Sequence, residues 1–206
     1  MLLKIYSENP EGKKLDVALD ILRSGGTIIY PTDSVYSLGC NLLNHKAVVK
    51  VAAIKGLKPE KANFTIIFKD LSTISEYTRP FDTWVYKLMK KALPGPFTFI
   101  LEANSNVPRI FKSKKKTIGI RVPDNNIPRM LVDRLGNPII STSIKDEDEV
   151  VEYTTDPELI HEKYQNKVDA VIDGGFMNNT ATTIVDCTGD EPVILRQGIG
   201  ILEDFI

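Results

Sequence analysis

The residues best suited to chemistry follow a short apolar run near the N-terminus. The run at 27–30 is β-branched or aromatic, which favours a strand, and Pro31 cannot donate a hydrogen bond to a sheet, so we expect the strand to stop there. The side chains released from strand pairing are then Thr32, Asp33, Ser34 and Tyr36. Proteins of the α/β class place binding sites at such strand ends. An ordinary transition from strand to loop, rich in turn-forming residues, is the alternative that this local pattern leaves open.

Further hydroxyl and cationic side chains fall at the ends of other expected strands. Ser141 and Ser143 are two residues apart, so they share one face of a strand, and Thr117 shares a face with Arg121 for the same reason. Hydroxyls combined with guanidinium and ammonium groups suit a ligand that carries phosphates and a carboxylate, such as a polyphosphate nucleotide. The full set is Thr32, Lys55, Lys58, Thr117, Arg121, Ser141, Ser143, Thr182, Thr183 and Arg196.

The elements that must position these residues alternate between helix and strand, which predicts an α/β fold rather than a bundle or a sandwich. An apolar stripe from Leu15 to Leu22 predicts a helix that ends at Gly25 and Gly26. Further helices are expected at 45–54, 84–92, 127–135 and 156–164. Strands are expected at 27–30, 64–68, 97–101, 117–122, 138–142, 168–172, 181–186 and 193–195. The last three follow one another without a helix between them, which predicts a mixed sheet.

Composition narrows the class of protein. The chain has 206 residues, 42% of them hydrophobic and 26% charged, which is enough for one full-sized core. No apolar run is long enough for a membrane span, and the first residues lack a signal-peptide pattern, so we expect a cytoplasmic protein. Two cysteines and two histidines, far apart in sequence, predict neither a disulfide framework, nor a metal site, nor a Ser/His/Asp hydrolase.

Charge is distributed unevenly along the chain. Residues 46–121 carry sixteen Lys or Arg against five Asp or Glu, a net +11, and the remainder carries a net −12. The middle of the chain therefore favours anionic partners. Lys87, Lys90 and Lys91 have the spacing of a solvated helix face, whereas the cluster at 112–116 precedes a strand and is a candidate contact to a phosphate backbone. A solvated basic loop is the alternative for that cluster.

Five segments in a fixed order resemble the motifs of a known family. They are Tyr30 to Asn41, Leu93 to Leu101, Ile118 to Pro123, Ile140 to Ser143, and Thr182 to Asp186 with Leu195 to Gly198. The chain resembles the YrdC/YciO family over nearly its whole length, and 63–65 with 116–123 resemble the YciO branch more than the YrdC branch. The resemblance implies a single YrdC-like domain over 1–206. That domain would have a twisted mixed parallel and antiparallel sheet, flanking helices and a deep positively charged cavity.

The resemblance also implies an activity, that of a threonylcarbamoyl-AMP synthase. Such a nucleotidyltransferase joins threonine, bicarbonate and ATP, with magnesium expected, into an adenylate, releases pyrophosphate and supplies a modification of adenosine in tRNA. The residues that would surround threonine by motif position are Thr32, Thr117, Arg121, Ser141 and Thr182, with Arg121 on the carboxylate. The residues that would contact the nucleotide are Lys55, Lys58, Ser143 and Arg196, the first three of them also as catalytic residues.

Two departures from the synthase pattern keep a second interpretation open. The Lys-x-Arg pair of the synthases stands here as Lys55-Gly-Leu-Lys58, and their Ser-x-Asn pair stands as Ser143-Ile-Lys145. Lysine lacks the bidentate fork of arginine, so catalysis could be weak or altered. The alternative is a regulatory protein that binds double-stranded RNA or tRNA through phosphates and shape, with steep salt dependence. We favour the enzyme, because the hydroxyl set expected around threonine is intact.

Overall fold

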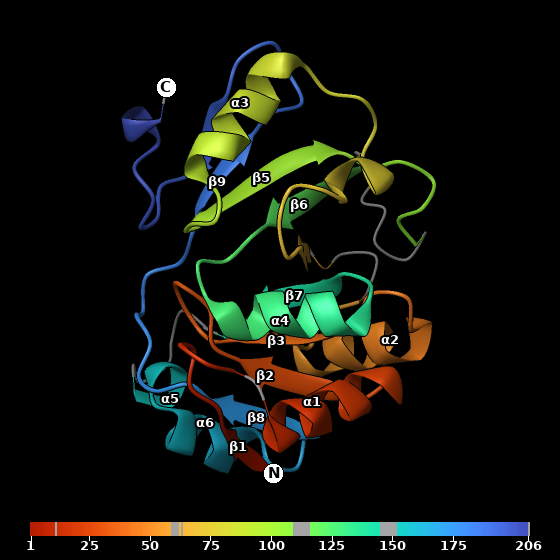
Figure 1. The fold of residues 1–206 in the computed structure, drawn as a ribbon, viewed down its shortest axis with the longest axis vertical. Coiled ribbons are helices and arrows are strands. Elements are labelled where there is room, and N and C mark those ends of the chain that lie inside the picture. Colours follow the sequence, from red (N-terminus) through yellow and green to blue (C-terminus); the bar gives the residue numbers. More distant parts are fainter. Residues whose placement is uncertain (11, 59–61, 63, 109–115, 145–151, 206) are drawn as a thin grey trace.

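The structure is a computed structural model that describes residues 1–10, 12–58, 62, 64–108, 116–144 and 152–205. Its described strands form one ten-stranded sheet in the order β1-β8-β2-β3-β7-β4-β6-β5-β9-β10 (Figure 1). The strands are β1 (Leu2–Lys4), β2 (Thr27–Tyr30), β3 (Ser37–Asn41), β4 (Thr65–Ile67), β5 (Phe97–Glu102), β6 (Thr117–Arg121), β7 (Ile139–Ser143), β8 (Ala170–Asp173), β9 (Thr183–Asp186) and β10 (Val193–Arg196). Parallel and antiparallel pairs both occur, so the predicted mixed sheet is confirmed.

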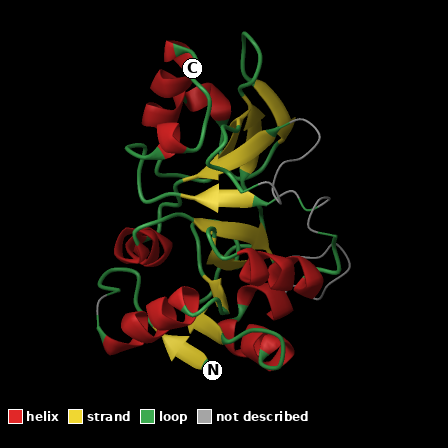
Figure 2. Ribbon diagram, turned by 90° about the vertical axis from the view of Figure 1, so that its right-hand side faces the viewer, coloured by secondary structure: helices red, strands yellow, loops and turns green. Residues whose placement is uncertain are grey.

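Helices lie on both sides of the strands (Figure 2). They are α1 (Lys13–Arg23), α2 (His45–Ile54), α3 (Thr83–Ala92), α4 (Asn126–Leu135), α5 (Glu152–Thr155) and α6 (Pro157–Tyr164), with short 3-10 turns at Ile74–Glu76 and Leu202–Asp204. Asn44 and Asn125 cap α2 and α4, because each side-chain oxygen accepts a hydrogen bond from a backbone N–H in the first turn. None of the described helices combines the length and apolar character that crossing a membrane requires.

Alternating side chains along the strands separate two cores. Ile29 and Leu38 point to the larger core, which packs under α2, α3 and α6, while Ile28 and Tyr30 point to a smaller core under α1 and α4. The strand residues of the smaller core come from β1, β2, β4, β7 and β8, and no described residue of β5, β6 or β9 belongs to it. On β6 and β5 the same face carries Thr117, Arg121 and Thr98 beside Gly119 and Ile100, so it is more polar there than over the smaller core.

The structure confirms most of the expected elements to within about two residues at their ends. The strand at Thr27–Tyr30 and the helix at His45–Ile54 have the predicted bounds, and Thr32, Asp33 and Ser34 follow the strand unpaired, as expected. Strands β1 and β3 and the short helix α5 were not predicted. In β3, Ser37–Asn41 holds serine, glycine and cysteine rather than β-branched residues, and its pairing with β2 and β7 is what makes it a strand.

Gly39 in β3 permits a close approach that positions Tyr30. A Cβ at this position would lie 2.3 Å from the Ile140 backbone oxygen and 2.9 Å from Cε1 of the Tyr30 ring. Because both atoms belong to buried strands, they cannot move aside at low cost. The missing side chain therefore lets the Tyr30 ring lie across β3.

We expect Gly39→Ala to lower the free energy of unfolding by about 1–3 kcal/mol, because it overpacks the centre of the sheet. Gly189→Ala is the matched control: a Cβ there meets no heavy atom within 4 Å, so its effect should stay within about 0.5 kcal/mol. Urea unfolding followed by circular dichroism measures both. Equal midpoints for the two variants would show that the sheet opens at Gly39 more easily than these distances indicate.

Candidate functional site

A row of small and hydroxyl-bearing residues crosses one face of the sheet. Ser141 of β7 is opposite both Gly39 of β3 and Thr65 of β4, and Thr65 is opposite Gly119 of β6. Residues opposite one another in paired strands point to the same face, so these positions line one surface. Ser143 belongs to the same face, because it is two residues beyond Ser141, as the sequence predicted.

The missing side chain of Gly119 lets two threonine methyl groups approach the backbone of β6. A Cβ there would lie 2.9 Å from Cγ2 of Thr65 and 3.0 Å from Cγ2 of Thr98. The two threonine methyl groups therefore flank a strip of bare backbone on β6. Thr117 and Arg121 stand on either side of Gly119 along the same strand and share its face, as predicted.

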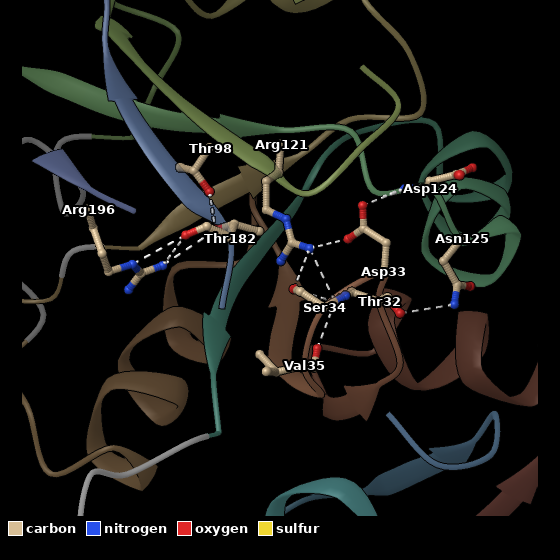
Figure 3. A network of polar contacts seen from close by, with 10 residues as sticks. All are labelled: Thr32, Asp33, Ser34, Val35, Thr98, Arg121, Asp124, Asn125, Thr182 and Arg196. Atoms are coloured by element: carbon tan, nitrogen blue, oxygen red, sulfur yellow. Dashed lines mark hydrogen bonds and ion pairs between the residues drawn. The ribbon is translucent and has the colours of Figure 1, made fainter. Parts of the chain in front are cut away.

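Arg121 ends β6 with its guanidinium group buried (Figure 3). Its Nη2 donates hydrogen bonds to Thr32 Oγ1 at 3.2 Å and Ser34 Oγ at 3.0 Å, and to Asp33 Oδ1 at 2.5 Å. The Arg121 and Asp33 side chains are 6% and 8% exposed. The segment Thr32 to Ser34, which follows β2, thus binds the Arg121 guanidinium.

The segment from Thr32 to Val35 is itself held in a tight turn. The Thr32 hydroxyl donates to the Val35 backbone oxygen at 2.7 Å and accepts from the Ser34 backbone N–H at 3.1 Å. The second Asp33 oxygen, Oδ2, accepts from the backbone N–H of Asp124 at 3.0 Å. This segment is therefore fixed both internally and to the loop between β6 and α4.

Thr182 and Arg196 reach the same face from the far end of the sheet. Thr182 Oγ1 and Thr98 Oγ1 are 2.9 Å apart and share a hydrogen bond, and both residues are buried. Arg196 Nη2 donates to the Thr182 backbone oxygen at 2.9 Å (Figure 3). Partial burial, and then the positive charge of Arg121, lower the pKa of the Arg196 guanidinium, so the two arginines are close enough to interact.

Two buried polar atoms at this site lack a hydrogen-bond partner among the described residues. They are Nε of Arg121 and the hydroxyl of Tyr30. Burial raises the pKa of Tyr30, and the neighbouring Ser141 side chain and the charge of Arg121 offset part of that rise, so the hydroxyl keeps its proton. The Ser141 hydroxyl beside Tyr30 is a possible acceptor for that group, whereas the Arg121 Nε–H has none among the described residues. A buried donor without an acceptor is costly, so the Arg121 Nε–H indicates that a ligand with an acceptor atom completes the site.

The structure links five of the residues expected from the sequence, and Thr117 and Ser143 lie on the same face of the sheet. Thr32, Arg121, Thr182 and Arg196 are linked by the contacts above, and Ser141 joins them through strand register and Tyr30. The Thr183 hydroxyl turns away from them and donates to the Gly200 backbone oxygen. Whether these residues bind threonine or a nucleotide stays a prediction.

The expected cationic residues are described only in part. Lys55 follows the last residue of α2 as its cap, and Lys58 is exposed in the segment after it. Their assignment to the nucleotide, with that of Ser143, stays a prediction. Lys145 and most of the basic cluster at 112–116 lie outside the described residues, as does most of the acidic stretch at 146–152. RNA binding and the positively charged cavity therefore stay predictions as well.

Sequence reasoning missed three residues of this site, Tyr30, Thr65 and Thr98, and it named Asp33 and Ser34 without a partner or a role. Asp33 was noted as released from the strand, but nothing in the local pattern paired it with Arg121, 88 residues away. The signal for Thr98 was available, because it is the one hydroxyl in the otherwise apolar run of β5. A hydroxyl at a buried strand position needs a partner, and here the partner is Thr182.

The arrangement suits binding of an anion and offers no nucleophilic thiol. Burial raises the pKa of the Cys40 and Cys187 thiols to about 12, so both are neutral at physiological pH. Within the described ranges no group of three or more His, Cys, Asp or Glu side chains could hold a metal ion. Guanidinium and hydroxyl donors remain, which bind carboxylates and phosphates.

Comparisons with known proteins agree with this geometry. The family model described as "Telomere recombination", which covers Sua5, YciO and YrdC proteins, matches residues 20–198. Escherichia coli YciO is 40% identical over 204 residues, which are 98% of this chain and 97% of that protein. The crystal structure of E. coli YciO superimposes with a TM-score of 0.91, covering 100% of this chain and 99% of that one.

Synthases of the same family are more distant. A threonylcarbamoyl-AMP synthase of Coxiella burnetii is 32% identical over 162 residues, 79% of this chain and 86% of that protein. Pyrococcus abyssi Sua5, in a crystal structure with L-threonine, has a TM-score of 0.88 at 26% identity, over 99% of this chain and 59% of that one. The chain belongs to the Sua5/YciO/YrdC family, and its similarity to YciO is greater than its similarity to these synthases.

Proposed function

We propose that this protein is an adenylate-forming enzyme of the threonylcarbamoyl-AMP synthase type. It would join threonine, bicarbonate and ATP, release pyrophosphate, and supply the adenylate used to modify adenosine in tRNA. The observation that carries the proposal is the buried Arg121 guanidinium, which Thr32 to Ser34 hold and whose Nε–H has no partner in the part of the chain that the structure describes. The relatives named as synthases and the Sua5 complex with L-threonine support the choice of reaction and amino acid.

The amino acid would occupy the face between Arg121 and the hydroxyl row. Its carboxylate would accept from Arg121, which forms stronger, more directional bonds to carboxylates than lysine does. The hydroxyls of Thr32, Thr117, Ser141 and Thr182 would surround the remaining polar groups, since each can donate or accept. Tyr30 adds a further donor beside Ser141.

The chemical step brings two anions together. The carboxylate of the threonine carbamate must attack the α-phosphorus of ATP in line with departing pyrophosphate, and the two groups repel each other. Lys55, Lys58 and Arg196 would lower that repulsion and stabilise the charge that develops on the leaving group, with Ser143 toward the ribose side of the nucleotide. Because Asp33 is engaged by Arg121 and Asp124, magnesium would arrive on the ATP phosphates, where it screens their charge.

The replacement of the synthase Lys-x-Arg and Ser-x-Asn pairs should lower the turnover rate of this protein. Lys58 carries a point charge where the synthases carry a planar fork, so a phosphate there is held less rigidly. We therefore expect turnover that is slow but dependent on all three substrates. Lys145, which stands where the synthases have Asn, would reach the same phosphate in compensation.

Pyrophosphate release from ATP tests the reaction itself. At high enzyme concentration with magnesium, release should require both threonine and bicarbonate, and threonylcarbamoyl-AMP should accumulate in equal amount by mass spectrometry. Pyrophosphate release at the same rate with and without threonine would contradict the proposal. Absence of pyrophosphate release, together with RNA binding whose affinity falls steeply as salt rises, would also contradict it and would favour the RNA-binding alternative.

Arg121→Lys tests the carboxylate subsite. The variant keeps the positive charge but loses the fork, so the threonine KM should rise about 10- to 100-fold while ATP affinity changes little. Arg79→Lys is the matched control, because Arg79 forms an exposed ion pair with Glu102 at 3.5 Å, whose worth is about 0–1 kcal/mol. An unchanged threonine KM in the Arg121 variant would remove this residue from the site.

Arg196→Ala tests the nucleotide subsite. We expect ATP affinity to fall about tenfold or more, because a charge-assisted contact to phosphate is lost. Arg79→Ala controls for loss of a surface arginine, and circular dichroism reports whether the variant folds. If the variant folds and binds ATP as the wild type does, Arg196 serves only to fix the Thr182 backbone.

A further inference from the structure

We infer that Asp33 is a positioning residue, which holds Arg121 so that the Nε–H edge of the guanidinium is left for the substrate carboxylate. This inference rests on the proposed function, because it assigns a role toward the amino acid of the same site. It concerns a residue that the sequence placed only among those released from β2. The evidence is the pattern of acceptors around Arg121 and the anchoring of Asp33.

The acceptors around Arg121 are all on one corner of the guanidinium. Nη2 faces Thr32, Asp33 and Ser34, which offer three oxygens to a group with two hydrogens. Nε, buried beside them, has no acceptor among the described residues. An arginine free to rotate would distribute its donors more evenly, so the imbalance indicates that its orientation is imposed.

Asp33 is the group that can impose it. Thr32 and Ser34 are neutral, whereas Asp33 adds charge, and a charged partner strengthens such a hydrogen bond roughly twofold. Its other oxygen is fixed by the Asp124 N–H at 3.0 Å, so the carboxylate is held from two sides. With both oxygens engaged, Asp33 is not poised to bind a substrate ammonium group, which leaves orientation of Arg121 as its role.

Charge at the site supports the same assignment. Arg121 and Asp33 cancel in net charge, and Arg196 supplies the second cation nearby. The site thus offers one net positive charge and one oriented Nε–H to a monoanion. Removing the Asp33 charge would leave two cations and an arginine without fixed orientation, so general attraction for anions would rise while recognition of a carboxylate would weaken.

Calorimetric titration of the full chain with L-threonine tests the inference. Asp33→Asn should weaken threonine binding at least tenfold, about 1.4 kcal/mol, without weakening ATP binding. Asp186→Asn is the matched control: its carboxylate accepts from the Thr188 backbone N–H and hydroxyl and is not among the Arg121 contacts, so threonine affinity should not change. Asp33→Glu retains the charge and should bind threonine within about threefold of wild type.

The Arg121 Nε–H signal in a nitrogen-15 NMR spectrum, assigned by its loss in Arg121→Lys, gives a readout that needs no threonine. It should be sharp and protected from exchange in wild type and Asp186→Asn, and broadened in Asp33→Asn. A protected signal in Asp33→Asn overturns the inference, as does normal threonine affinity in any folded variant whose Arg121 signal is broadened. If Asp33→Asn does not fold, Asp33→Ser, which also removes the charge, replaces it in both measurements.

The two experiments separate failure of this inference from failure of the proposed function. Wild-type protein that binds no threonine contradicts the proposed function alone, and the NMR comparison still decides whether Asp33 orients Arg121. Wild-type binding with unchanged binding in folded Asp33→Asn contradicts the positioning role alone. Weaker binding with a broadened signal supports both.

Discussion

A buried guanidinium must find its charge and hydrogen-bond partners inside the protein, and this constraint organises the site around Arg121. Moving an arginine out of water costs several kcal/mol unless an anion and further acceptors meet it. Here Asp33 supplies the charge, and Thr32 and Ser34 supply hydroxyl oxygens. Removing one partner of such a buried pair costs about 3–5 kcal/mol, because the other charge is left uncompensated. The need to neutralise the buried Arg121 guanidinium therefore holds the turn after β2 against the end of β6.

The sheet meets this requirement through small residues at chosen positions. Gly39 lets the Tyr30 ring lie across β3 toward Ser141, and Gly119 lets the methyl groups of Thr65 and Thr98 approach the backbone of β6. Larger residues at either position would push side chains into the face that carries the hydroxyl row. The strand residues of the core under α1 and α4 come from β1, β2, β4, β7 and β8, and no described residue of β5, β6 or β9 belongs to that core.

Local patterns in the sequence were enough for the elements but not for their partners. The helix at 45–54 and the strand at 27–30 were predicted at their true bounds, because apolar spacing and the break at Pro31 are local signals. β3 was missed, since Ser37–Asn41 is a strand only by virtue of its neighbours. For the same reason Thr32 and Arg121 could be named as candidates, while the Asp33 contact that joins them, across 88 residues of chain, could not.

The motif order carried more information about the site than composition did. Thr182 and Arg196 lie in separate motifs that look unrelated along the chain, and their contact depends on β9 pairing with β5 on one side and β10 on the other. Periodicity assigns each of these segments to a strand but says nothing about which strands are adjacent. A family resemblance predicts which strands are adjacent, because one order of motifs along the chain belongs to one sheet topology.

Net charge at the site limits what a single subsite can hold. The net charge of Arg121, Arg196 and Asp33 is +1. One carboxylate neutralises this charge, whereas a triphosphate carries more negative charge than it can balance. If a nucleotide binds beside an amino acid, its phosphates need further cations, and the chain's net positive segment from 46 to 121 is the source for them. Lys55 and Lys58 of that segment would then join Arg196 at the phosphates, which shift during reaction and tolerate a point charge on a flexible stem. The carboxylate needs the fixed direction that Arg121 gives.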